Sequence, residues 1–200
     1  MAVLALALVV VWLALVAGLR GYLRFRRTGD FGVAFRDRRG SPQWWARLVS
    51  GLGAVFAIAA PIADLAGLPS AEPLDHPVIS VVGVALVVLG IACTVATQLV
   101  MGDSWRGDVD LAVRTALVTT GPFRLVRNPI FTATAMTGIG LALLVPNVFS
   151  AAMLVAFLVA LQLQVRLVEE PYLLRVHGDG YREYAARTGR FLPWVGRIRP

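Results

Sequence analysis

Long apolar runs, separated by polar segments rich in arginine, dominate the chain. A transmembrane helix needs ~20 predominantly apolar residues to cross the ~30 Å hydrocarbon core of a bilayer. Five runs reach or approach this length: Ala2 to Leu19, Trp44 to Leu68, Pro77 to Met101, Ile130 to Val145 and Val148 to Val168. Only Pro146 and Asn147 separate the last two, which predicts a tight helical hairpin. We therefore expect an all-α integral membrane protein with about five transmembrane helices and short cytoplasmic helices at its C-terminal end.

The composition supports this class. Hydrophobic residues make up 58% of the chain and charged residues 16%, whereas a soluble domain has ~45–50% and ~25%. Soluble globular, disordered and collagen-like classes are excluded by this balance. The net charge of +7 does not indicate nucleic-acid binding, because the arginines lie between apolar runs rather than on one basic face. The single cysteine, Cys93, excludes an internal disulfide and a cysteine-rich metal site, and we predict no metal.

The arginines predict the topology. All 19 basic residues are arginines: eight lie in residues 20–47, four in 102–128 and seven from 166 onward. With five spans, these three segments fall on one side of the membrane, and cationic loops stay cytoplasmic. We expect a multi-pass cell-membrane protein with its N-terminus outside and its C-terminus in the cytoplasm. The absence of lysine suggests GC-rich coding and a bacterial inner membrane.

The first apolar run is interpreted as a span. It lacks a cationic segment before it and is longer than the ~7–15 apolar residues of a signal peptide. We divide the chain into an N-terminal three-helix part, residues 1–101, and a cofactor-binding catalytic part, residues 102–200, which holds a loop, the hairpin and an amphipathic tail. Thr94, Thr97 and Gln98 share one face of the third span, where such side chains more often stabilise helix packing than bind substrate.

The segment before the fourth span has the features of a helix start. Pro129 suits a first helical turn, and Asn128 before it is a good N-cap. The free N–H groups of such a start can hold a carboxylate, with Arg127 beside them. The alternative is a plain helix start with an arginine anchored at the membrane interface.

Two adjacent carboxylates, Glu169 and Glu170, close the fifth span. Negative charge is unfavourable at the C-terminal end of a helix, so the pair needs a partner. Arg166, one turn earlier, is one candidate. A cationic ligand is the other.

Taken together, these motifs resemble the isoprenylcysteine carboxyl methyltransferase family and the related membrane methyltransferases that act on phospholipid amines and small thiols. The resemblance covers residues ~103–193, about the last half of the chain. It is carried by Leu117 to Phe123, Arg127 to Phe131, Glu169-Glu170, Gly178-x-x-Tyr181-x-x-Tyr184 and Arg190 to Pro193. Four positions depart from the usual family residues, namely Asn128 for His, Phe131 for Tyr, Ala133 for Gly and His177 for Phe, and these argue against a strict protein-prenylcysteine enzyme.

The resemblance implies methyl transfer from S-adenosylmethionine to a lipophilic or small thiol, carboxylate or amine acceptor at the cytoplasmic membrane face. Carried over by position, it predicts cofactor contacts at Thr115, Ala116, Leu117, Val118, Phe123, Arg127, Asn128, Pro129, Ile130, Phe131 and Glu169. We assign the catalytic roles to Arg166 and Glu170.

Two other functions stay open at this point. One is an NADPH-dependent membrane reductase of the sterol-reductase type, although the acidic pair suits a phosphate-rich cofactor poorly. The other is a non-catalytic membrane protein that binds or assembles partners.

Overall fold

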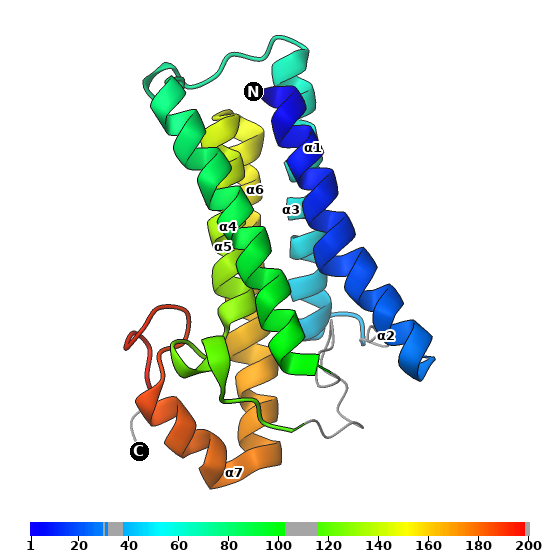
Figure 1. Ribbon diagram of the computed structural model, residues 1–200, viewed down its shortest axis with the longest axis vertical. Coiled ribbons are helices and arrows are strands. Elements are labelled where there is room, and N and C mark those ends of the chain that lie inside the picture. Colours follow the sequence, from blue (N-terminus) through cyan, green and yellow to red (C-terminus); the bar gives the residue numbers. More distant parts are fainter. Residues whose placement is uncertain (30, 32–37, 103–115, 199–200) are drawn as a thin grey trace.

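The computed structural model describes residues 1–29, 31, 38–102 and 116–198, and this part of the chain is helical apart from its connections (Figure 1). The predicted contact Thr115 lies outside the described residues. The helical elements are α1 (Ala2–Leu13), the π-helix η1 (Ala14–Leu19), α2 (Arg20–Thr28), α3 (Pro42–Leu65), the 3-10 helix η2 (Glu72–Leu74), α4 (Pro77–Met101), the 3-10 helix η4 (Gly121–Arg124), α5 (Pro129–Leu144), α6 (Val148–Gln164), the π-helix η5 (Val165–Glu169) and α7 (Glu170–Arg187).

The predicted membrane-spanning helices are confirmed, with differences at their ends. Four helical stretches are long and apolar enough to cross a bilayer, and the fifth, α5, is a shorter apolar helix. The third span has the predicted bounds, Pro77–Met101. At ~1.5 Å per residue, the 16 residues of α5 span ~24 Å. The protein is an all-α integral membrane protein, as the sequence predicts.

The end of the fifth span differs from the prediction. The helix does not stop near Val168 but passes through η5 into the first half of α7. Pro171 does not break it, because a proline fits the first turn of α7. The interruption lies at Gly178, whose non-helical φ of 52° divides α7 into two short helices. Short helical segments therefore close the C-terminal end, as the sequence predicts, and the first of them continues the last span.

Small residues allow the spans to pack closely. Helix α4 lies against α5, and α3 lies against α6. A Cβ atom on Gly90 would lie 2.2 Å from Oγ1 of Thr137, and one on Gly140 would lie 2.6 Å from the carbonyl oxygen of Gly83. Glycine at such contacts is the usual way for membrane helices to approach one another. The α4–α5 pair is therefore a tightly packed unit of the bundle.

Polar side chains within the spans serve this packing. Thr94 and Thr97 each donate to a carbonyl of their own helix, at 2.8 and 2.7 Å. Gln98 donates through Nε2 to the carbonyl of Val16 in the first span at 2.9 Å. These bonds fit the predicted packing role of the three residues.

The two ends of the bundle differ in content. The N-terminus, the loop after α3 and the α5–α6 turn share one end (Figure 1), and there the Ala71 N–H donates to the Pro146 carbonyl at 2.7 Å. Helix α2, η4, α7 and the C-terminal segment share the other end. This grouping is the one that five spans require. The side that faces the cytoplasm stays a prediction.

Candidate functional site

The segment before α5 and the C-terminal tail lie side by side at the lower end of the bundle in Figure 1. The N–H of Arg127 donates to the carbonyl of Gly189 at 2.8 Å, and the N–H of Asn128 donates to the carbonyl of Arg190 at 3.1 Å. Val126 and Gly189 form a parallel bridge. The tail is thereby fixed to the start of a membrane-spanning helix.

Three charged side chains bind these segments to α7. Glu170 accepts at Oε1 from Nη2 of Arg127 at 2.7 Å and from Nε of Arg190 at 2.9 Å, and at Oε2 from Nη2 of Arg190 at 2.8 Å. The Arg127 and Glu170 side chains are 1% and 8% exposed. We call these three residues the ion-pair cluster. Its arginines come from the loop before α5 and from the tail, and its carboxylate opens α7.

The cluster keeps Glu170 ionised. Burial alone would raise the pKa of this carboxyl group, but the hydrogen bonds from Arg190 and Arg127 outweigh burial and hold the pKa below its ordinary value. The same hydrogen bond to Glu170 raises the pKa of Arg190. The buried ion pairs of Glu170 have a structural role, because removing the carboxylate or an arginine would leave the remaining charge uncompensated.

Arg127 and Asn128 do not lie as the sequence suggests. Besides Glu170, the terminal nitrogens of Arg127 donate to the carbonyls of Ala185, Thr188 and Gly196, so both Nη groups are used within the protein, whereas its buried Nε has no hydrogen-bond partner among the described residues. Asn128 stands at the N-cap position of α5, but its side chain makes no cap bond. Its Nδ2 donates instead to the Arg190 carbonyl at 3.0 Å. The expected side-chain cap is therefore wrong.

Within the described part of the chain, the first backbone N–H groups of α5 remain free to bind a ligand. Intrahelical bonds leave the first N–H groups of a helix without acceptors, and here Asn128 does not take them. Pro129 is buried, whereas Ile130 and Phe131 are half-buried at this turn. Of the predicted cofactor contacts, these backbone positions keep the features expected of an anion site.

The loop that leads to this turn contains the 3-10 helix η4. Phe123 is buried, and its carbonyl accepts from the hydroxyl of Tyr184 at 2.7 Å. Leu117 and Val118 are half-buried, and Ala116 is exposed. Phe123 is thus brought to α7, whereas Ala116, Leu117 and Val118 lie in the extended connection ahead of η4.

The two glutamates have different surroundings. Glu170 is enclosed by the ion-pair cluster. Glu169 is half-buried and accepts one hydrogen bond, from Nε2 of Gln164 at 3.3 Å. No arginine or histidine of the described residues forms an ion pair with it. Arg166, one of the two partners that the sequence offers for the acidic pair, forms an ion pair with neither glutamate. Its Nε donates to Oε1 of Gln162 at 2.6 Å.

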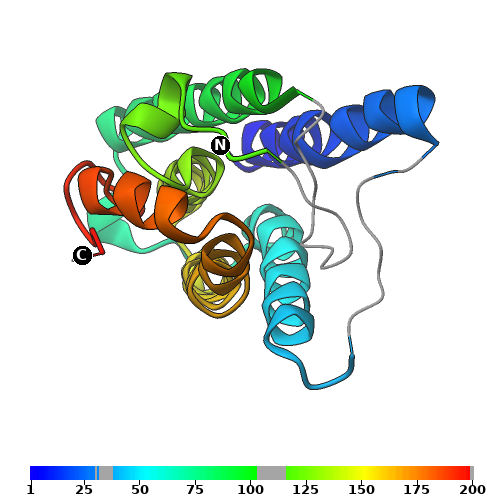
Figure 2. The ribbon, with the colours of Figure 1, turned by 90° about the horizontal axis from the view of Figure 1, so that it is seen from below.

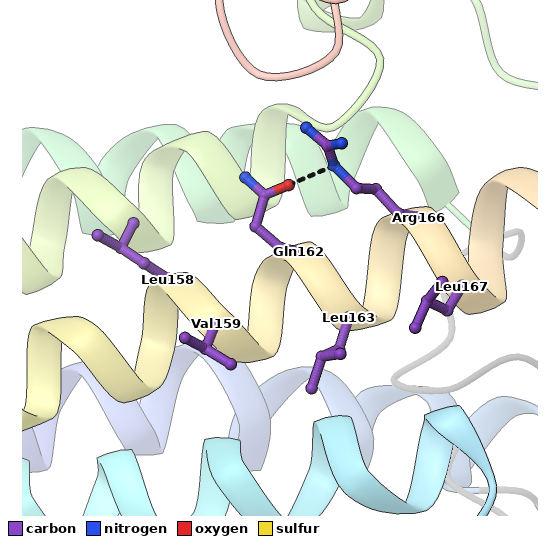
Figure 3. A pocket seen from close by; sticks show the side chains of 6 residues that line it. All are labelled: Leu158, Val159, Gln162, Leu163, Arg166 and Leu167. Carbon is purple, nitrogen blue, oxygen red and sulfur yellow. Dashed lines mark hydrogen bonds between the residues drawn. The ribbon is translucent and has the colours of Figure 1, made fainter.

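Arg166 lies in a groove on the outer face of the last span (Figure 3). The groove has a volume of about 370 Å³ and is lined by Leu158, Val159, Gln162, Leu163, Arg166 and Leu167. Gln162 and Arg166 point to the same side of the helix in Figure 3, whereas Val159 and Leu163 point to the other. The groove is apolar along its length, with one polar pair near the end that leads to Glu169.

Arg190 belongs to the site, although the sequence does not indicate its partner. The residue stands in the Arg190 to Pro193 motif, but its pairing with Glu170, 20 residues earlier, is not visible in any local pattern. The adjacent glutamates are the sequence feature that points to such a partner, since a buried carboxylate needs a cation from elsewhere in the chain.

Comparisons with known proteins agree with this architecture. A search of solved structures finds a eukaryotic intramembrane Ras methyltransferase, isoprenylcysteine carboxyl methyltransferase, with a TM-score of 0.58 and 18% identity over 92% of this chain. The chain spans 66% of that protein's length, and at this identity the likeness shows the fold. A search of curated proteins finds no match.

A family model gives the stronger result. The model described as phospholipid methyltransferase matches residues 78–180, which run from the first turn of α4 to just past the bend in α7. The match covers more than half of the 200 residues and confirms the membrane methyltransferase resemblance seen in the motifs. The chain therefore belongs to the phospholipid methyltransferase family.

Proposed function

We propose that this protein transfers a methyl group from S-adenosylmethionine to a lipophilic or small acceptor, through a thiol, carboxylate or amine, at the cytoplasmic face of the membrane. Family membership supports the methyl transfer and favours it over the reductase and the non-catalytic alternatives. The choice of donor is supported by the residues at the lower end of the bundle.

The contrast between the two adjacent glutamates carries the proposal. Glu170 has two arginines and needs no further partner. Glu169 is half-buried with one long hydrogen bond from a neutral amide. A carboxylate withdrawn from water without a cation is unfavourable. Glu169 therefore fits the ammonium or the ribose hydroxyls of the cofactor.

Other residues of this end suit the remaining groups of the cofactor. The N–H groups of Ile130 and Phe131, at the positive end of α5, suit its carboxylate. The half-buried ring of Phe131 suits a cation, since a sulfonium over an aromatic face gains ~0.5–2 kcal/mol. When bound, S-adenosylmethionine supplies an electrophilic methyl group, which the acceptor's lone pair takes as the carbon–sulfur bond breaks.

The groove on the last span suits an apolar acceptor. Leu158, Val159, Leu163 and Leu167 provide an apolar wall. The Nη groups of Arg166 make no bond to the described residues and suit an anionic group of the acceptor. The role assigned to Arg166 is to position the acceptor, and the role of Glu170 is to hold the site together. Alignment of donor and acceptor with water excluded is the main catalytic requirement of such a transfer.

Titration calorimetry on the purified protein in detergent tests the donor. Glu169→Gln removes charge with little change in volume, and a charge-assisted hydrogen bond is worth ~1.5–3 kcal/mol. At ~1.4 kcal/mol per decade we expect a roughly 10- to 150-fold weaker binding of S-adenosylmethionine. Glu183→Gln is the matched control, because that side chain is exposed on α7 at 71%, and its affinity should equal the parent's.

The same titrations can also contradict the proposed donor and the role of Glu169. Binding of NADPH, with no binding of S-adenosylmethionine, would contradict the donor. Unchanged affinity in Glu169→Gln would remove Glu169 from the cofactor site. For the acceptor, Arg166→Gln should raise KM for an anionic acceptor and leave the affinity for S-adenosylmethionine unchanged.

A further inference from the structure

The tail beyond α7 forms a tight turn that displays apolar side chains. The N–H of Arg190 donates to the carbonyl of Val195 at 2.7 Å, and the N–H of Val195 donates to the carbonyl of Leu192 at 3.2 Å. Leu192, Trp194 and Val195 are 58%, 75% and 61% exposed. We call residues 191–195 the Trp194 turn. Such a group of large exposed apolar side chains marks an interaction surface.

The conformation of the Trp194 turn is well defined by its contacts. Trp194 has a φ of 65°, a left-handed conformation that a bulky residue rarely adopts. Gly189 is closely enclosed, since a Cβ there would lie 2.0 Å from the carbonyl oxygen of Leu192. Arg190, at the start of the turn, is held by both oxygens of Glu170. The protein therefore holds a tryptophan outward in a strained conformation.

The position of the turn indicates its partner. The Oγ1 of Thr132, in the first turn of α5, donates to the carbonyl of Phe191 at 2.8 Å. The turn thus lies beside the point where a spanning helix enters the bilayer. In Figure 1 it is level with the lower ends of α4 and α5, above the lowest part of α7, and Figure 2 shows it at the periphery of the bundle.

We propose that the Trp194 turn inserts into the interfacial layer of the leaflet that α5 enters. Tryptophan is the residue most suited to this layer, because its ring is apolar and its N–H is polar. Arg124 and Arg197 are exposed on the adjoining segments and complement lipid phosphates. The bilayer then holds the tail that carries Arg190, so that the lipid surface supports the ion-pair cluster. This inference does not depend on the methyl acceptor.

Spin-label accessibility in proteoliposomes of zwitterionic and anionic phospholipid tests the insertion. In a Cys93→Ala background, nitroxide labels at Leu192→Cys and Val195→Cys should collide more often with oxygen, which concentrates in lipid, than with aqueous Ni-EDDA. A label at Asp179→Cys, on the bend of α7 where the side chain is 87% exposed, is the control and should show the reverse ratio. Equal Ni-EDDA accessibility at 192, 195 and 179 would overturn the proposal.

A second measurement avoids the labels. The chain has five tryptophans, so the difference in fluorescence between the parent and Trp194→Phe isolates Trp194. Lipids brominated near the carbonyl end of the acyl chain should quench this difference signal more strongly than lipids brominated near the chain end. A difference signal that no brominated lipid quenches would also overturn the insertion.

Discussion

Arg127 and Glu170 are 43 residues apart in the sequence and are joined by a buried ion pair of 2.7 Å. The arginine precedes α5 and the glutamate follows the last span, so the pair links the two ends of the hairpin at the lower end of the bundle. Arg190 extends the link to the tail. A single carboxylate thus determines the relative position of three segments that the site requires.

Glu170→Gln should destabilise the protein strongly. Removing one member of a buried ion pair costs ~3–5 kcal/mol, because the remaining charge is left uncompensated. We expect a clearly lower melting temperature in detergent without cofactor. Glu169→Gln is the matched control and should melt close to the parent. Equal melting of Glu170→Gln and the parent would show that the cluster does not hold the tail.

Acid should weaken the protein through the same residue. The pKa of Glu170 in the folded protein lies below its ordinary value of 4.5. Its contribution to stability is therefore present above the unfolded-state pKa and is lost as the pH falls through the folded-state pKa. Melting curves between pH 7 and pH 3 should show this acid loss in the parent. In Glu170→Gln the loss should be smaller, and parallel curves for the two proteins would contradict the assignment.

Gly140→Ala should disturb the contact between α4 and α5. The added Cβ would lie 2.6 Å from the carbonyl oxygen of Gly83, and overpacking of this kind costs ~1–3 kcal/mol. Gly51→Ala in α3 is the control, because no atom of the described residues lies within 4 Å of its Cβ position. It should be neutral or stabilise by up to ~1 kcal/mol through helix propensity. Unfolding in mixed detergent measures both, and equal effects would show that the helices separate freely.

The topology prediction needs a reporter. All 19 arginines fall on one side under the five-span reading, so the C-terminus should be cytoplasmic and the N-terminus external. A fluorescent protein that folds only in the cytoplasm should be bright when fused after Pro200. A secreted phosphatase fused there should be inactive. The reverse result would invert the molecule and place the ion-pair cluster on the external side.

The sequence predicts the spans well because hydrophobicity is a local property. The bounds of α4 were predicted without error, and α5 and α6 were predicted to within a residue at their N-terminal ends. The extension of the last span into α7 was not predicted, because the polar residues after Val168 look like the end of a helix. Contacts with the loop and the tail stabilise those turns, and such contacts leave no local pattern.

The candidate site was predicted less completely. The motifs identified the segments that meet, but they did not show which polar groups pair with one another. Asn128 and Arg127 look like a cap and an anion ligand when only their neighbours are considered. In the structure Asn128 binds Arg190 in the tail, 62 residues away. Arg127 binds both Glu170 at the start of α7, 43 residues away, and Gly196 in the tail, 69 residues away. Such long-range hydrogen bonds decide whether a polar side chain is structural or remains for a ligand.

The π-helical turn η5, Val165–Glu169, joins α6 to α7 and changes the direction in which their side chains point. A π-turn holds one residue more than an α-turn, so the helix beyond it is rotated by ~100° about the axis. The phase of α6 suits its contacts with α3 and α5 inside the bilayer, and the phase of α7 suits the arginines outside it. The extra residue in η5 therefore lets α6 and α7 each turn the required face towards its own partners. Glu169 ends η5 and Glu170 begins α7, so the two side chains leave the helix in different directions. Glu170 thereby reaches both arginines, and Glu169 remains available to a ligand.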